Sequence, residues 1–287
     1  MKKILISNVI VLSILFSQTW ELKYNYPLHR TYGTDITITE HNKYACVGYI
    51  KDTLNCRKYL LLKITNIGAV ELEKIYSWSD SCDYAEFWSI YSTDDNGFII
   101  SGSNIRNVLL RTDSLGNIIW FREYGRYGDP VAGLNDVIQV SGGNFIATGF
   151  KALSGVFAMK INSIGDSLWA YFYDTVPGIG ASIVEDYDRN LLITGETYYS
   201  SAISKICLLK INSDGEIILT RTYGGLSCYG NSIIKINSEK TKGYLIVGSQ
   251  WDTTHYDASG DIYFIKLNEE YNIIWERTYS YTTESDD

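Results

Sequence analysis

The segment Tyr59–Lys63 (YLLLK) is the first of five near-copies of one apolar stretch that ends in a basic residue. The other copies end at Arg111, Lys160, Lys210 and Lys266, so consecutive copies lie 48, 49, 50 and 56 residues apart. Self-similarity at a period of about 50 residues is typical of an array of stacked units. The repeat therefore decides the architecture before any other feature of the chain.

Three further positions recur in each copy. Five residues after the basic residue come Gly68, Gly116, Gly165 and Gly215, with Tyr271 as the one departure. Thirteen residues after it come Tyr76, Tyr124, Tyr173, Tyr223 and Tyr279. Upstream, segments such as Phe98–Gly102 end on Gly48, Gly102, Gly149, Gly195 and Gly248. Each unit thus carries the same strands and the same turns.

The character of the segments differs within a unit. The glycine-ended strands and the YLLLK-type strands are almost continuously apolar, which indicates that both of their faces are covered. The last strand, as in Ile118–Tyr124, alternates and places Trp, Arg and Tyr on one face, which suits a half-exposed outer strand. We interpret that row as a structural ladder with the guanidinium over the rings. A cation-binding cage is the alternative, but the row returns in every unit.

Four strands in about 50 residues describe one blade of a β-propeller. The sequence predicts an all-β propeller of four-stranded antiparallel blades with five complete repeats, either five-bladed or part of a larger ring. The domain spans 20–287, and its repeats cover roughly these ranges: 30–76, 77–124, 125–173, 174–223 and 224–279. Residues 1–19, with Lys2, Lys3 and a short apolar run, have the pattern of a secretory signal peptide.

Composition limits the partners. The net charge is −8 and no Lys/Arg cluster occurs, which argues against nucleic acid and anionic lipid. We expect a monomer that does not insert into a membrane once the signal is cleaved, and that is secreted, extracellular or on the cell surface, with the periplasm as an alternative. The five cysteines leave at least one thiol outside an intrachain disulfide, and Cys228 is expected in a loop.

Two resemblances follow from these motifs. The pattern Gly97–Gly102, then Leu109–Trp120, then Tyr124-Gly125 resembles the secreted β-propeller repeat proteins of bacteria, many of which carry a C-terminal sorting domain. That resemblance covers nearly all of 30–279 and implies fold and export but almost no activity. The Gly-to-Trp spacing is also distantly similar to quinoprotein-like propellers. Their adjacent cysteines are missing here, so no quinone cofactor is expected.

Loops on a rigid scaffold are where binding usually resides. The distance from the strand-ending glycine to the basic residue varies (15, 9, 11, 15 and 18), whereas the later turn is constant. We therefore expect ligands at the variable loops, where exposed rings and carboxylates suit a carbohydrate or a peptide. The candidate ligand-binding residues are Trp78, Asp83, Tyr84, Tyr127, Tyr198, Trp251, Asp252 and Tyr256. The alternative is a merely solvated acidic rim.

No catalytic residue can be assigned. No nucleophile motif is present, and no cofactor is expected. Ca²⁺ on Asp252, Asp257, Ser259 and Asp261 is conceivable, but the spacing fits no known loop. The sequence thus predicts a binding or scaffold module for protein or glycan. The alternatives are an extracellular polysaccharide lyase or hydrolase that uses acids at the variable loops, and a structural fragment of a longer surface protein.

Overall fold

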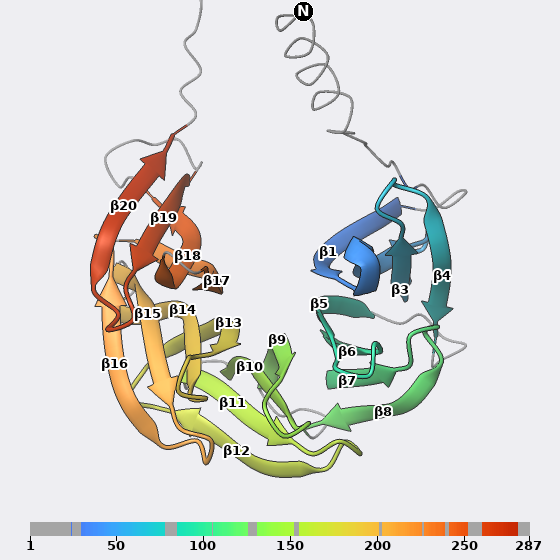
Figure 1. The fold of residues 1–287 in the computed structure, drawn as a ribbon, viewed down its shortest axis with the longest axis horizontal. Coiled ribbons are helices and arrows are strands. Elements are labelled where there is room, and N and C mark those ends of the chain that lie inside the picture. Colours follow the sequence, from blue (N-terminus) through green and yellow to red (C-terminus); the bar gives the residue numbers. More distant parts are fainter. Residues whose placement is uncertain are drawn as a thin grey trace, which may run out of the picture.

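The computed structural model describes residue 24 and residues 30–77, 85–104, 106–125, 131–151, 155–200, 203–225, 227–238, 241–251 and 260–280. They form five four-stranded antiparallel sheets and one 3-10 turn, Glu40–Asn42. Figure 1 shows the sheets fanned about a common axis, with the first strand of each nearest that axis. The chain is a five-bladed β-propeller, which confirms the predicted fold. The predicted signal peptide lies outside the described residues.

Each blade uses four consecutive strands in chain order. The first two blades are β1 (Arg30–Ile38), β2 (Tyr44–Lys51), β3 (Arg57–Ile64), β4 (Val70–Tyr76), and β5 (Glu86–Ser92), β6 (Phe98–Ser103), β7 (Asn107–Thr112), β8 (Ile118–Tyr124). The third is β9 (Val131–Gln139), β10 (Phe145–Lys151), β11 (Gly155–Ile161), β12 (Ser167–Tyr173). The last two are β13 (Gly178–Glu185), β14 (Leu191–Ser200), β15 (Ile203–Ile211), β16 (Ile217–Tyr223), and β17 (Cys228–Asn237), β18 (Lys242–Gln250), β19 (Asp261–Leu267), β20 (Ile273–Tyr279).

The recurring glycines predicted to end the second strands lie inside them, because each strand continues past its glycine, and they face a bulge in the innermost strand. In blade 4 the register shifts between Gly180 and Ser182, and a Cβ at Gly195 would overlap the carbonyl oxygen of Ile179. The other four blades have the same register shift beside the equivalent glycine. Only a residue without a side chain fits against this carbonyl, which explains why the position recurs.

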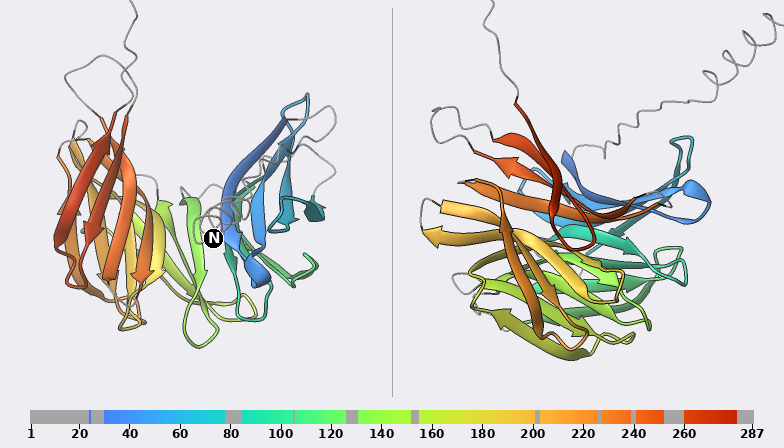
Figure 2. Two further views of the ribbon diagram at one scale, coloured as in Figure 1. Left: turned by 45° about the horizontal axis from the view of Figure 1, so that its top comes forward. Right: turned by 60° about the vertical axis from the view of Figure 1, so that its left-hand side comes forward.

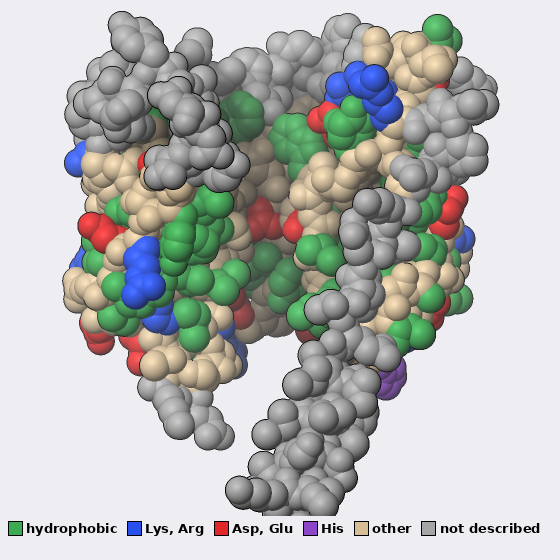
Figure 3. Space-filling model, turned by 90° about the horizontal axis from the view of Figure 1, so that it is seen from above, with side chains coloured by type: hydrophobic (Ala, Val, Ile, Leu, Met, Phe, Trp, Pro, Cys, Tyr) green, Lys and Arg blue, Asp and Glu red, His purple; other side chains and the backbone are tan. Residues whose placement is uncertain are grey.

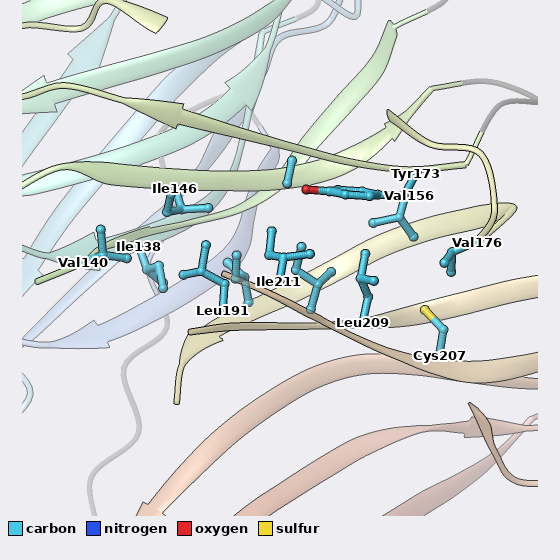
Figure 4. Packing of buried hydrophobic residues seen from close by; sticks show 13 residues of the cluster. Ile138, Val140, Ile146, Val156, Tyr173, Val176, Leu191, Cys207, Leu209 and Ile211 are labelled. Atoms are coloured by element: carbon cyan, nitrogen blue, oxygen red, sulfur yellow. The ribbon is translucent and has the colours of Figure 1, made fainter. Parts of the chain in front are cut away.

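Apolar side chains between neighbouring sheets form the core. The buried residues of blades 3 and 4 in Figure 4 interdigitate from both sheets, for example Ile146 and Val156 against Leu191 and Leu209. Similar clusters fill the other three junctions between consecutive blades. The second and third strands of blades 2, 3 and 4 are therefore covered on both sides, as their continuous apolar sequence predicts, whereas blades 1 and 5 each have a neighbouring sheet on one side only. Figure 2 shows from the side how the twisted sheets stack in this way.

The tyrosine that closes each blade binds the next blade. The hydroxyl of Tyr173 donates to the carbonyl oxygen of Gly215 at 2.9 Å. Corresponding bonds run from Tyr76 to Gly116, from Tyr124 to Gly165 and from Tyr223 to Tyr271, at 2.7–2.8 Å. The predicted ladder thus has a second role, because its hydroxyl groups link each blade to the following turn.

Replacing Tyr173 by phenylalanine is expected to lower the free energy of unfolding by about 1–2 kcal/mol, because the carbonyl of Gly215 loses its donor in a buried place. Urea denaturation measures the change. Tyr279→Phe is the matched control, because Tyr279 closes the last blade and is 54% exposed. An equal effect of both substitutions would contradict the role assigned to the bond.

A second set of bonds links the blades near the axis. The carboxylate of Asp35 accepts from the backbone N–H of Ile90 at 2.9 Å, and that of Asp136 accepts from Ile183 at 2.9 Å. The hydroxyl of Ser89 donates to Asp136 at 2.7 Å. Burial raises the pKa of both aspartates. These acids are engaged with the next blade's backbone and serve the fold.

Tyr271 stands where the other repeats have glycine, and it adopts the same left-handed backbone, with φ of 64° against 85° at Gly215. Its hydroxyl accepts from Lys210 at 2.8 Å and donates to Asp186 at 3.2 Å. Lys210 and Asp186 form a buried ion pair at 2.8 Å. Tyr271 of blade 5 therefore hydrogen-bonds to both members of an ion pair in blade 4.

The cysteines differ in part from expectation. Cys228 is the first residue of β17 and is buried, so its prediction as a loop residue was wrong. Its side chain packs beside Gly224. The innermost strand of blade 5 begins at Cys228, earlier than the sequence pattern indicated. Cys46 and Cys207 are free thiols in strands, and Cys56 is in a disulfide. Within the described ranges no helix has the length and hydropathy to cross a membrane.

Candidate functional site

The C-terminal part of β14 (Leu191–Ser200) brings an acid and a ring together, so Tyr198, which was predicted in a variable loop, lies in a strand. Glu196 directly follows the anchor Gly195 on β14, and Tyr198 lies two residues further on, so both side chains leave the strand on one side. The hydroxyl of Tyr198 donates to one carboxylate oxygen of Glu196. The chain here is fixed because the N–H of Tyr198 and the hydroxyl of Thr197 both donate to the carbonyl of Pro177, at 2.8 and 2.9 Å.

The carboxylate of Glu196 is buried and only partly hydrogen-bonded. Its side chain is buried, and its second carboxylate oxygen has no hydrogen-bond partner. Burial raises the pKa of this carboxyl, although the bond from Tyr198 acts in the opposite direction. Tyr198 itself is 44% exposed. An exposed ring therefore lies beside a buried carboxylate whose second oxygen has no hydrogen-bond partner.

Blade 5 places a second ring at the same end of the propeller. Trp251 follows β18, and its backbone N–H donates to the carbonyl of Ser227 at 3.0 Å. The indole is 40% exposed. It packs over Gly260, where an added Cβ would lie 3.3 Å from the ring. β14, which carries Tyr198, contacts β17 at the start of blade 5, so the two blades meet at this point.

Next to Trp251 the surface is hollowed. A cavity of about 530 Å³ opens between the ends of blades 4 and 5. Polar groups line it, among them Gln250, Tyr263, Glu276 and Arg277. The hydroxyl of Tyr263 donates to Glu276 at 2.6 Å, which fixes the carboxylate at the wall. A concave polar surface with exposed aromatic rings at its edge is suited to a hydroxyl-rich ligand.

The acid of blade 2 at this face is already paired. Glu86 forms an ion pair with Arg57, and the indole N–H of Trp88 donates to it at 3.1 Å. The guanidinium of Arg57 lies over the ring of Tyr49, 5.0 Å from its centroid. This cluster joins blades 1 and 2, and Glu86 has fewer free positions for a ligand than Glu196.

The opposite face also has a hollow, of about 300 Å³, lined by residues such as Lys160, Glu185 and Arg189 of blades 3 and 4. Glu185 accepts from the N–H and the hydroxyl of Ser141 at 3.1 and 2.9 Å. Its walls come from the constant turns, and no exposed aromatic ring lines it. It is the weaker candidate for recognition.

The predicted ligand residues divide in two. Tyr198 and Trp251 are described, and both lie exposed at the variable-loop end of neighbouring blades. The others lie outside the described residues: Trp78, Asp83, Tyr84, Tyr127, Asp252 and Tyr256. Glu196 was missed. Its signal was available, because the position after the strand-ending glycine is uncharged in the other four repeats: Tyr49, Ser103, Phe150 and Ser249.

No cofactor site is evident in the described part of the chain. There, no group of three or more His, Cys, Asp or Glu side chains is arranged to hold a metal ion. Of the four residues considered for Ca²⁺, only Asp261 is described, as the first residue of β19, while Asp252, Asp257 and Ser259 lie outside the described ranges.

No protein-family profile and no curated protein matches the chain. Solved structures do. A protein of unknown function from Bacteroides caccae is 15% identical with a TM-score of 0.60, covering 90% of this chain and 85% of that chain. One from Dyadobacter fermentans is 13% identical with a TM-score of 0.57, covering 84% and 77%. The Dos1 propeller is 11% identical with a TM-score of 0.53, covering 92% and 74%. At these identities the chain shares the β-propeller fold with those proteins, and the likeness extends no further.

Proposed function

We propose that this protein is an exported binding module that recognises a carbohydrate at the variable-loop end of blades 4 and 5. The observation that carries the proposal is Glu196, whose buried carboxylate oxygen lacks a partner beside the exposed ring of Tyr198. Sugar rings stack on aromatic side chains, and their hydroxyl groups donate to carboxylates. Trp251 and the polar hollow next to it extend the same surface.

Two features support export. The N-terminal sequence has the pattern of a signal peptide. Cys56 is in a disulfide, a bond that persists in oxidising compartments. The net charge of −8 is compatible with a neutral glycan and unfavourable for polyanions.

The test is a glycan array followed by calorimetry with the glycan that binds. Tyr198→Ala and Trp251→Ala are each expected to weaken binding about tenfold or more, because an anchoring aromatic side chain typically contributes more than 1 kcal/mol. Tyr171→Ala is the matched control, since Tyr171 is a similarly exposed ring on the outer strand β12.

A protein ligand is the alternative occupant. It would be revealed if no glycan bound but a surface pull-down gave a partner whose binding depended on Tyr198 and Trp251. If neither assay gave a ligand, or if Tyr171→Ala weakened binding as much as the two site variants, the proposal would fail.

One observation favours an enzyme as the second candidate. A carboxyl whose pKa is raised by burial has the property required of a general acid, and Glu196 is such a group. Hydrolysis of a polysaccharide also requires a second carboxylate within roughly 5–9.5 Å. Release of reducing sugar that is abolished in Glu196→Gln, while binding is kept, would establish activity.

A further inference from the structure

The outward face of the last blade exposes side chains that every earlier blade buries. Ile262 on β19 is 53% exposed, whereas Val156 and Ile206 at the same position of blades 3 and 4 are fully buried. Trp275 and Tyr279 of β20 are exposed as well. In the earlier blades these positions pack against the following sheet and its turn.

The same face holds a buried cation without a partner. The ammonium group of Lys266 makes no hydrogen bond, although the residue is buried. The equivalent lysines of the two preceding blades each reach the next blade's turn: Lys160 donates to the carbonyl of Ser213 at 3.0 Å, and Lys210 donates to the hydroxyl of Tyr271 at 2.8 Å. Lys266 therefore lacks the contact that a following blade would provide.

The first blade shows the complementary half of this junction. Ile36 on β1 is 56% exposed, whereas Val137 at the equivalent position of blade 3 is fully buried by the preceding sheet. Around it lies an apolar hollow of about 320 Å³, lined by side chains that include Cys46, Leu60 and Leu62. In blades 2 to 5 the corresponding surface packs against the blade before it.

Both unfinished faces border one opening. Figure 1 shows β1–β4 and β17–β20 on opposite sides of it, and Figure 3 looks down into the hollow with apolar side chains on its walls. In each of the four existing junctions, one blade offers the side that faces the next blade, and the next blade offers the side that faces back. Blade 5 leaves the first kind of side uncovered, and blade 1 leaves the second. An element that fills the opening must contact both at once, and one further repeat unit has both sides.

We propose that a sixth four-stranded blade of the same repeat, continuous with this polypeptide, fills the opening between blades 5 and 1. Its third-to-fourth-strand turn supplies a carbonyl for the hydroxyl of Tyr279 and an acceptor for Lys266. Its innermost strand carries a serine whose hydroxyl donates to Asp35, as Ser89 donates to Asp136 in the junction between blades 2 and 3.

The experiment adds a blade of known sequence. A second copy of residues 125–173 is fused after Ser280, and thermal unfolding is compared with the unextended chain. We expect the Tm to rise by about 5 °C or more and the fluorescence of Trp275, exposed in the present chain, to shift to shorter wavelength. In the extended protein Tyr279→Phe should now lower the Tm as Tyr173→Phe does, whereas it is neutral without the extension.

The control is the same extension in an Ile262→Asp background, which should remove the gain in Tm. An unchanged Tm on extension, with Tyr279→Phe still neutral, overturns the proposal. So does a stable dimer of the unextended chain, by light scattering, that Ile36→Asp or Ile262→Asp dissociates, because a second copy then covers the faces. Mass spectrometry of the polypeptide from its natural host completes the test, and a chain without a sixth repeat contradicts the continuity proposed.

Discussion

Replacing Lys210 by methionine is expected to lower the free energy of unfolding by about 3–5 kcal/mol, the usual cost of breaking a buried ion pair. The substitution leaves Asp186 as a buried carboxylate without its cation, and it removes a donor from Tyr271. Methionine keeps the length and the apolar stem, so the loss reports on the charge. Urea denaturation at pH 7 measures it.

The matched control is Lys160→Met, because Lys160 occupies the same repeat position but donates to a backbone carbonyl near the surface. Its loss should cost below about 1 kcal/mol. Similar losses at the two sites would show that the buried pair is no stronger than an ordinary contact.

The effect of Lys210→Met should depend on pH. Burial acts to raise the pKa of Asp186, but hydrogen bonds from Lys210 and from backbone N–H groups outweigh it and hold the pKa below its usual value. A carboxyl with a lowered pKa in the folded state stabilises the fold above its unfolded pKa of about 3.9. This contribution disappears as the pH falls through the folded pKa. The difference between wild type and variant should therefore shrink below about pH 4.

Gly195→Ala is expected to destabilise blade 4 by about 3 kcal/mol, at the upper end of the usual cost of overpacking. The added Cβ would overlap the carbonyl oxygen of Ile179, which belongs to backbone and cannot rotate away. Thermal unfolding followed by circular dichroism measures the loss.

Gly33→Ala is the control, because no atom lies within 4 Å of the Cβ that it would add. It should change stability by less than about 0.5 kcal/mol. If Gly195→Ala were equally silent, the bulge at Gly180 would have to move freely, and the steric explanation of the recurring glycine would be wrong.

The repeat made most of the fold predictable. The five copies that end at residues such as Lys63 and Lys266 correctly predicted five four-stranded blades, and they left open a larger ring. The continuous apolar strands correctly indicated sheets covered on both sides in blades 2 to 4, whereas blades 1 and 5 each leave one side exposed. Two contacts were beyond reach. The bond from Tyr173 to Gly215 joins residues of different blades, and the burial of Asp136 depends on a bulge that periodicity does not reveal.

The candidate site was only partly predictable. Trp251 is exposed just after β18, as its predicted loop position indicated, whereas Tyr198 is exposed although it lies within β14 and not in the predicted loop. Glu196 was missed because the strand was predicted to end at Gly195, whereas β14 continues to Ser200 and includes Glu196. Its burial and its unpaired oxygen result from the packing of blade 4 against blade 5, which a single sequence does not show.

The hydroxyl bonds between blades all point in the same direction along the chain, from each tyrosine to the turn of the unit after it. Gain or loss of a whole repeat by recombination would consequently preserve every such link and leave the protein foldable. The exception is the Lys210–Asp186–Tyr271 cluster, whose members come from two particular units. Blades 4 and 5 must therefore be inherited together, as one indivisible module of an otherwise interchangeable series.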